Sequence, residues 1–336
     1  MRYLITGITG FAGPHLANLL VEKGNEVYGL IRSSNGIEED IRDIVPDKYF
    51  SKIKFIYGDL TRSKDIERVL SEYKFDGVFH LAAQSHPPMS FRDPEGTRET
   101  NVSGTNNLMD SISRFQRDCA LMFCSTSEVY GEVDESKMPM NEECPIRPVN
   151  PYGLSKAISD VDVLGRANIK AKPFDLPFFV TRGFSHTGPR RGKTFSISSD
   201  AYQLTRIKKG LQEPIVSVGT LSSKRVVMDV RDCVKAYSML MERATKRDEN
   251  VIGHAFNVGG DSLYTIGELL DKMIEISGLE GKVEKKIDTK FVRPIDIPVQ
   301  IPDSKKLRNL TGWSPEISVT EKTLPNLLEY WDKKIN

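Results

Sequence analysis

Residues 1–13 read MRYLITGITGFAG, a short apolar run that leads directly into a glycine-rich loop. The apolar run predicts a strand, and the spacing of apolar residues from Pro14 to Glu22 predicts a helix after the loop. Three glycines at this position permit a tight turn and bring backbone N–H groups close to a pyrophosphate, which the helix N-terminus also favours. The strand–loop–helix order therefore indicates a dinucleotide-binding site. The loop residues that we expect at the cofactor are Gly7, Thr9, Gly10, Phe11 and Gly13.

Short apolar runs and longer amphipathic runs alternate from this loop onward. Such alternation predicts an α/β protein, a Rossmann fold with a doubly wound parallel sheet and helices on both faces. The second half is less regular, and we expect it to form a smaller C-terminal substrate-binding lobe. We assign residues 1–180 to the dinucleotide-binding domain, with a later strand returning to it, and residues 181–336 mainly to the interleaved lobe. The predicted strands are 3–5, 27–31, 55–57, 77–81, 121–124 and 178–182, and the predicted helices are 14–22, 65–73, 105–115, 200–209, 269–277 and 324–331.

The composition excludes several classes of protein. With 336 residues and 39% hydrophobic content, the chain is long and apolar enough to fold as an ordinary globular enzyme. Lys+Arg (47) and Asp+Glu (46) nearly balance, which argues against a nucleic-acid or anionic-membrane partner. No run of about 18 apolar residues predicts a membrane span, and the chain starts without a signal peptide. The four cysteines and five histidines lack metal-ligand spacing, so we expect no metal and reduced thiols in the cytoplasm.

The end of the second predicted strand favours NADP over NAD. NAD-binding proteins tend to place a carboxylate there, against the ribose 2′-hydroxyl, whereas an arginine accommodates a 2′-phosphate. This sequence has Arg32 followed by Ser33. Two further segments follow predicted strands, at the sheet edge where cofactors lie in this type of fold. Their candidate cofactor residues are Asp59 and Leu60, with Asp59 near the adenine, and Leu81, Ala82 and Ala83.

Two motifs carry the predicted chemistry. Tyr152 and Lys156 are four residues apart, which places a phenol and an ammonium on one face of a helix that Pro151 can begin. The ammonium favours the phenolate, so the phenol can act as a base near neutral pH, and both side chains are also candidate cofactor contacts. Upstream, Thr126 and Glu128 follow a predicted strand, where Thr126 can hydrogen-bond a substrate hydroxyl and Glu128 adds a carboxylate.

Together these motifs resemble the extended short-chain dehydrogenase/reductase superfamily. Within it, the chain is most similar to the GDP-mannose 4,6-dehydratases, which share the Ser-Thr-Ser-Glu loop, the Arg-Ser end of the second strand and a Pro-Arg-Arg-Gly segment. The resemblance covers nearly the whole chain. It rests on Gly7/Gly10/Gly13, Leu81–His86, Ser125–Gly131, Tyr152/Lys156 and Pro189–Gly192.

The resemblance implies an internal redox reaction on a GDP-hexose, GDP-mannose or a close relative. Tyr152 would take the C4 hydroxyl proton while hydride passes to NADP. The 4-ketone acidifies C5, and Glu128 would take the C5 proton. Water leaves from C6, the hydride returns there, and the product is a 4-keto-6-deoxy sugar. The resemblance also implies a homodimer or homotetramer. The residues that we expect at the substrate are Ser85, His86, Ser127, Ser185, Arg191, Lys193, Arg225 and Arg293, because arginine forks match phosphate oxygens and the others lie near the motifs.

Several positions keep alternatives open. Ser185 stands where dehydratases often have Asn, and Val226-Val227 stands where the family usually has Asp and an aromatic residue. Residues 213–219 and 293–298 look more like the sister GDP-4-keto-6-deoxymannose reductases. A reductase of the 4-keto product and an NDP-sugar 4-epimerase on the same scaffold are therefore the alternatives, and neither needs Glu128. A non-catalytic NADP-binding protein is disfavoured, because such proteins usually lose the catalytic Tyr or Lys.

Overall fold

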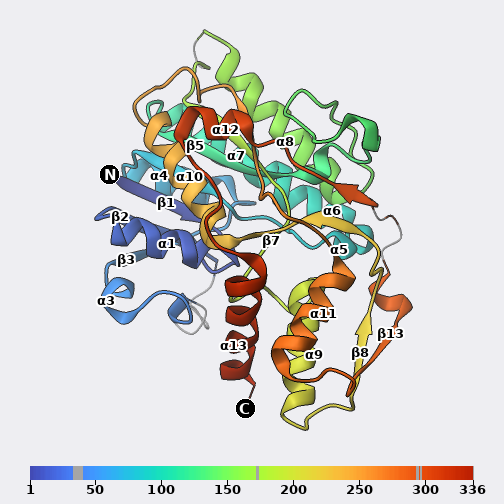
Figure 1. The fold of residues 1–336 in the computed structure, drawn as a ribbon. Helices are drawn as coiled ribbons and strands as arrows, with labels where there is room; N and C mark the ends of the chain where they lie inside the picture. Colours follow the sequence, from blue (N-terminus) through green and yellow to red (C-terminus); the bar gives the residue numbers. More distant parts are fainter. Residues whose placement is uncertain (33–40, 172–173, 293–294, 296, 336) are drawn as a thin grey trace.

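A seven-stranded parallel sheet forms the centre of the computed structural model, which describes residues 1–32, 41–171, 174–292, 295 and 297–335 (Figure 1). Within these ranges the strand order is β11-β6-β5-β4-β1-β2-β3, and each neighbouring pair is parallel. The predicted Rossmann-type α/β fold is therefore confirmed. The strands are β1 (Arg2–Thr6), β2 (Glu26–Ile31), β3 (Ile53–Tyr57), β4 (Gly77–His80), β5 (Ala120–Thr126), β6 (Phe178–Gly183) and β11 (Ala255–Val258).

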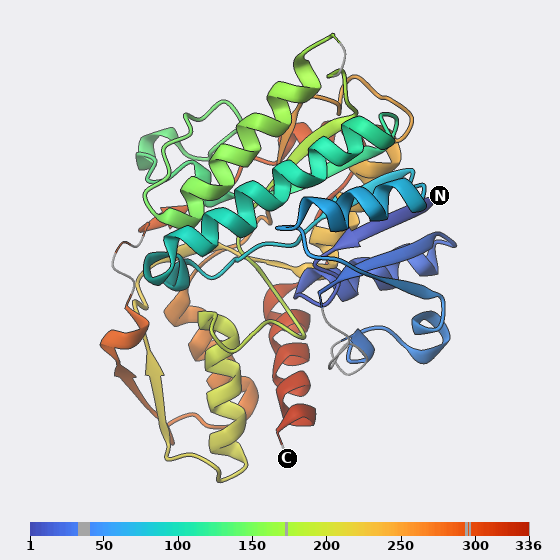
Figure 2. The same ribbon diagram turned by 180° about the vertical axis from the view of Figure 1, so that it is seen from behind.

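Helices cover both faces of the sheet because each strand sends apolar side chains to both sides. In β1, Tyr3 and Ile5 pack into one apolar layer, and Leu4 packs into the other. Figures 1 and 2 show the two helical layers from opposite sides. The first layer has α1 (Ala12–Glu22), α10 (Val230–Ala244) and α12 (Lys305–Thr311), and the second has α4 (Ser63–Glu72), α7 (Gly104–Phe115) and α8 (Pro151–Asn168).

A second apolar core holds the C-terminal lobe together below the sheet in Figure 1. It is formed by α9 (Ser196–Lys208), α11 (Ile266–Ser277), α13 (Leu324–Lys334) and β8 (Ile215–Val218). The exposed strand β13 (Glu284–Ile287) pairs with β8. The short strands between the lobe and the sheet are β7 (His186–Thr187), β9 (Lys224–Val226), β10 (Met228–Asp229), β12 (Leu263–Thr265) and β14 (Val299–Gln300). The remaining short helices are α3 (Asp47–Phe50), α5 (Pro87–Arg92), α6 (Pro94–Arg98), η1 (Glu99–Ser103), η2 (Ser127–Val129), η3 (Glu135–Lys137), η4 (Thr289–Phe291) and η5 (Val319–Thr323).

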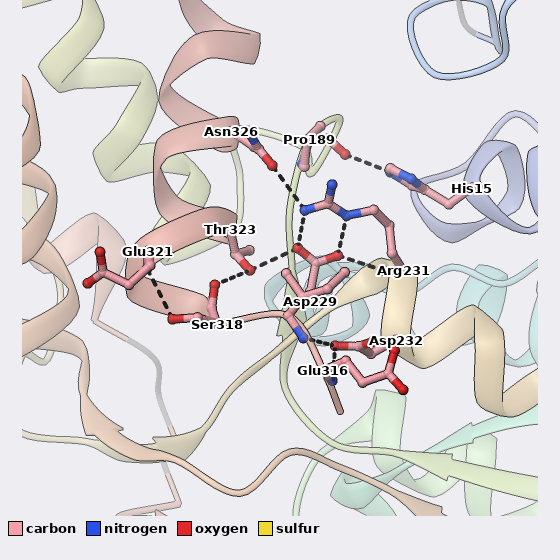
Figure 3. Close-up of polar contacts among 11 residues, drawn as sticks. His15, Pro189, Asp229, Arg231, Asp232, Glu316, Ser318, Glu321, Thr323 and Asn326 are labelled. Atoms are coloured by element: carbon pink, nitrogen blue, oxygen red, sulfur yellow. Dashed lines mark hydrogen bonds and ion pairs between the residues drawn. The ribbon is translucent and has the colours of Figure 1, made fainter. Parts of the chain in front are cut away.

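A buried carboxylate joins the C-terminal helix to the strand that leads into α10 (Figure 3). Asp229 accepts hydrogen bonds from the Nη2 atom of Arg231 at 2.7 Å and from the hydroxyl of Thr323 at 2.8 Å. Burial opposes ionisation of Asp229, but these partners outweigh it and hold the pKa of the carboxyl below its ordinary value. The network fixes β10 and α13 relative to each other, beside the segment that leads from β7.

Several elements were missing from the sequence-based assignment, among them α12 and the short strands between the lobe and the sheet. Helix α10 was not predicted, although its apolar residues face the first layer at helical spacing. Strand β11 was expected only as an unplaced later strand. None of the helices in the described ranges has both the length and the apolar character needed to cross a membrane. Nor do three His, Cys, Asp or Glu side chains gather there as a metal-binding cluster.

Candidate active site

The glycine-rich loop lies between β1 and α1, against the end of β4. Gly7 has a φ of 75°, and a Cβ atom there would lie 2.7 Å from the amide nitrogen of Ala82. A Cβ atom at Gly13 would collide with the Gly7 carbonyl oxygen and with Ile8. Because only glycine fits both places, the backbone can face a phosphate at the start of α1. The structure places the other predicted residues of this region, Thr9, Gly10, Phe11, Leu81 and Ala83, in the same loop or at the end of β4.

A cavity of about 260 Å³ opens at the ends of β2 and β3, and Arg32, Asp59 and Arg62 line it together with Arg68. Asp59 accepts hydrogen bonds from the amide and hydroxyl of Thr61, both at 2.9 Å. Partial burial opposes ionisation of Asp59. The Thr61 hydrogen bonds and the charges of Arg32 and Arg62 outweigh burial and lower the pKa of the carboxyl. The cavity therefore combines two carboxylates, those of Asp59 and Asp65, with three guanidinium groups.

The other residues near this cavity differ in where the structure places them. Leu60 is buried, and its carbonyl oxygen accepts a hydrogen bond from the Asn107 side chain at 2.8 Å. Ser33 lies outside the described residues. Arg62 was not predicted, although its place three residues after Asp59 at the same sheet edge was a usable signal.

The predicted catalytic residues meet where β5 ends and α8 begins. Tyr152 is buried, with 9% of its surface exposed, and shares a hydrogen bond with the Thr126 hydroxyl. Burial raises the pKa of the Tyr152 phenol, and the charges of Cys124 and Glu128 raise it further, whereas the Thr126 hydrogen bond opposes the rise. Lys156, one turn along α8, is buried too, and burial lowers its pKa to about 8. Burial thus favours the neutral form of each group, so that the charges of the site and of its ligands decide when either one ionises.

Asn150 joins the Glu128 carboxylate to the start of α8. Its Oδ1 atom caps the helix by accepting from the Gly153 amide at 2.7 Å, and its Nδ2 atom donates to Glu128 Oε2 at 2.8 Å. A Cβ atom at Gly153 would lie only 2.8 Å from the Glu128 carbonyl oxygen, so glycine allows this close approach. Asn150 was not among the predicted site residues, although Asn before Pro-Tyr is a typical helix N-cap signal.

An arginine-rich segment after β7 closes over the glycine-rich loop. His15 Nε2 donates to the Pro189 carbonyl oxygen at 3.0 Å (Figure 3). Arg190 donates to the carbonyl oxygens of Thr9 and Gly10 at 2.6 and 3.1 Å. The guanidinium of the next residue, Arg191, lies 3.5 Å from the Phe195 ring centroid and 4.7 Å from that of Phe11. The segment thereby holds positive charge beside the loop.

The other predicted substrate residues are spread around this centre. His86 contacts the Phe195 ring edge, with centroids 5.6 Å apart, so it shares a neighbour with Arg191. Ser85 and Lys193 are exposed, and Ser185 is half-buried. Ser127 donates to the Gln300 side chain at 3.3 Å, and Arg225, beside Gln300 in the neighbouring strand, donates to the Lys224 carbonyl oxygen at 2.8 Å. Arg293 lies outside the described residues.

Known proteins resemble this chain along its whole length. A family model described as GDP-mannose 4,6 dehydratase matches residues 4–323. A GDP-mannose 4,6-dehydratase of Vibrio cholerae is 30% identical, over 98% of this chain and 93% of the relative. A GDP-6-deoxy-D-mannose reductase of Pseudomonas aeruginosa is 28% identical, over 99% of this chain and 98% of the relative. The structure of RMD from Pseudomonas aeruginosa complexed with NADPH has a TM-score of 0.80 and 26% identity, and the match covers 99% of each chain.

Proposed function

This chain belongs to the GDP-mannose 4,6-dehydratase family of the extended short-chain dehydrogenases/reductases, and we propose that it converts a GDP-hexose, GDP-mannose or a close relative, into the 4-keto-6-deoxy sugar. The observation that carries the proposal is the carboxylate of Glu128, which Asn150 holds at the start of the helix that bears Tyr152. Oxidation at C4 alone needs no such carboxylate, whereas elimination of water needs a base for C5.

Tyr152 removes the proton of the C4 hydroxyl in this proposal. Thr126 orients that hydroxyl and stabilises the phenolate through their hydrogen bond, and the Lys156 ammonium favours the same charge. Bound NADP⁺ supplies a hydride acceptor for C4 and later a hydride donor for C6. The burial of Tyr152 and Lys156 keeps bulk water away from the reacting atoms.

Glu128 takes the C5 proton once the neighbouring ketone has made it acidic. The Asn150 amide keeps the carboxylate oxygen in a fixed direction, so the base is positioned before substrate arrives. The hydroxyl at C6 then leaves as water with the proton that Glu128 holds. Glu128 therefore acts first as a base and then as an acid within one turnover. When the hydride returns to C6, C5 takes up a proton, and the proton that Tyr152 removed from the C4 hydroxyl balances this step.

The described residues fit an NADP cofactor. The glycine-rich loop has room only for backbone at Gly7 and Gly13, as a pyrophosphate cradle requires. Arg32 and Arg62 line the cavity at the end of β2, where a 2′-phosphate would find guanidinium partners. The similar Pseudomonas aeruginosa protein was solved with NADPH, which supports the same choice.

The variant Arg32→Asp tests NADP preference. We expect its Kd for NADPH to rise about 100-fold, because a charged hydrogen-bonding partner is replaced by a repelling carboxylate, while the Kd for NADH changes little. Fluorescence titration of both cofactors measures this. Arg68→Asp is the matched control, because Arg68 lines the cavity but donates to the Tyr57 carbonyl oxygen. Equal effects of Arg32→Asp on NADPH and NADH would contradict the NADP assignment.

A reductase of the 4-keto sugar is the second candidate, supported by the reductase relative that covers nearly all of this chain. Mass spectrometry of products from a panel of NDP-sugars with trace NADP⁺ separates the two functions. A dehydratase yields a product lighter by one water from GDP-mannose. Net use of NADPH with the keto sugar would favour the reductase, and conversion between sugars of equal mass would favour a 4-epimerase.

We also propose that the chain assembles through the outer face of α8 into a homodimer or homotetramer. Leu154, Ile158 and Val161 are 49%, 40% and 56% exposed, and their spacing places them on one stripe of the helix. We expect light scattering to give at least a dimer for the wild type and a monomer for Ile158→Glu. A monomeric wild type, or an unchanged mass for Ile158→Glu, would contradict this interface.

The proposal also covers the roles of the two domains and the location of the protein. Residues 1–180 would hold the cofactor, and residues 181–336 would mainly hold the nucleotide sugar. The four cysteines, Cys119, Cys124, Cys144 and Cys233, are free thiols, which supports a cytoplasmic location.

A further inference from the structure

Gln300 lies between the catalytic turn and Arg225. Its strand, β14, pairs in parallel with β9, and the register places Gln300 next to Arg225. Its Oε1 atom accepts a hydrogen bond from the Ser127 hydroxyl at 3.3 Å. Partners in register on neighbouring parallel strands project to the same face, so the Gln300 and Arg225 side chains lie side by side. Gln300 therefore connects two parts of the site that are far apart in the chain.

The amide nitrogen of Gln300 makes no hydrogen bond within the described part of the protein. The side chain is only 3% exposed, and its Nε2 atom finds no hydrogen-bond acceptor within the described part of the chain. A buried N–H donor without an acceptor destabilises a folded protein unless a ligand or a water molecule supplies one. The Gln300 donor is thus available to a ligand oxygen.

The position of Gln300 indicates which part of the ligand that oxygen belongs to. In the proposed reaction, the sugar reacts at Tyr152, which is hydrogen-bonded to Thr126, immediately before Ser127. Arg225 is one of the arginines that we expect at the diphosphate and sugar, and this proposal places the diphosphate beside it. The sugar ring must span the interval between these points, and the Gln300 amide borders the same interval.

We propose that Gln300 donates a hydrogen bond from Nε2 to a hydroxyl oxygen of the hexose and so contributes to sugar selectivity. This inference rests on the proposed function, because it assumes that a nucleotide sugar occupies the site. Gln300 acts on the sugar, and Arg225 acts on the diphosphate. Removing the Gln300 donor should therefore weaken the binding of a nucleotide sugar. It should not weaken the binding of the nucleoside diphosphate, which lacks the sugar.

The test compares GDP-mannose with GDP, by calorimetry on the NADPH-saturated enzyme, which cannot oxidise C4. In Gln300→Met, which keeps the length of the side chain and removes the donor, we expect the Kd for GDP-mannose to rise about tenfold. The Kd for GDP should stay unchanged. Gln212→Met is the matched control, because the Gln212 amide donates to the Ile215 carbonyl oxygen within the lobe. It should change neither affinity.

Equal losses for GDP-mannose and GDP in Gln300→Met, or no loss for either, would overturn the inference. If thermal unfolding shows that this variant does not fold, Gln300→Glu takes its place, because it keeps an acceptor for Ser127 but has no N–H donor. If the wild type binds neither GDP-mannose nor GDP, the proposed function fails instead. The same comparison with a UDP-hexose and UDP then decides the Gln300 inference by the same two outcomes.

Discussion

Replacing Glu128 with Gln is expected to lower the rate of dehydration by about 10³-fold, because an amide cannot take the C5 proton. The substitution keeps the size of the side chain, and an oxygen remains for the Asn150 amide. C4 oxidation should still proceed through Tyr152, so reduced nicotinamide should accumulate with substrate. Rapid-mixing absorbance measures the oxidation, and mass spectrometry measures the loss of water.

Glu132→Gln is the matched control, since Glu132 is an exposed carboxylate four residues away. It should leave both steps unchanged. If Glu128→Gln dehydrates GDP-mannose at the wild-type rate, Glu128 is not the base, and the elimination mechanism is wrong. If the variant loses C4 oxidation as well, Glu128 has a wider role than the one assigned here.

Replacing Tyr152 with Phe is expected to lower kcat by about 10³-fold or more, because the phenol is the group that takes the C4 hydroxyl proton in the proposed reaction. Circular dichroism and the Kd for NADPH should remain close to wild type, since the ring that packs in the site is kept. A Tyr152→Phe enzyme with more than about a tenth of wild-type activity would contradict the assignment.

The pH dependence of kcat in the variant Lys156→Met tests whether the Lys156 ammonium acts through the Tyr152 phenol. Burial raises the pKa of the Tyr152 phenol. A protonated Lys156, four residues along the same helix, would favour the phenolate as an opposite charge. Without that ammonium the phenol ionises only at higher pH, so the rising limb of the kcat profile should move to higher pH. Because burial lowers the Lys156 pKa to about 8, the wild-type rate should level off or fall above about pH 8. An unchanged profile in the variant would show that Lys156 does not act through the phenol.

Local patterns in the sequence were enough to predict the parts of the site that lie within one element. The strand, glycine-rich loop and α1 are contiguous, and Tyr152 and Lys156 share one helix turn. Thr126 and Glu128 follow one strand, and the parallel sheet brings its edge to the start of α8. Each of these placements follows from periodicity and short spacing alone.

Contacts between distant segments could not be predicted in this way. Arg190 bonds the carbonyl oxygen of Thr9, 181 residues earlier, and Ser127 bonds Gln300, 173 residues later. Nothing in the local pattern around either residue specifies these partners, because they depend on how the lobe packs against the sheet. The Arg190 contact also needs a left-handed backbone with a φ of 73°. Long-range packing of this kind becomes visible only in the folded structure.

In the proposed function, one active site oxidises C4, eliminates water and reduces C6 without net use of cofactor. The most direct measurement incubates GDP-mannose carrying deuterium at C4 with the enzyme and catalytic NADP⁺, and locates the deuterium by NMR. We expect a 4-keto-6-deoxy product with the deuterium at C6 and no accumulation of reduced cofactor. Deuterium that is lost to the cofactor pool, or an enzyme that leaves GDP-mannose unchanged and consumes NADPH with the 4-keto sugar, would contradict it.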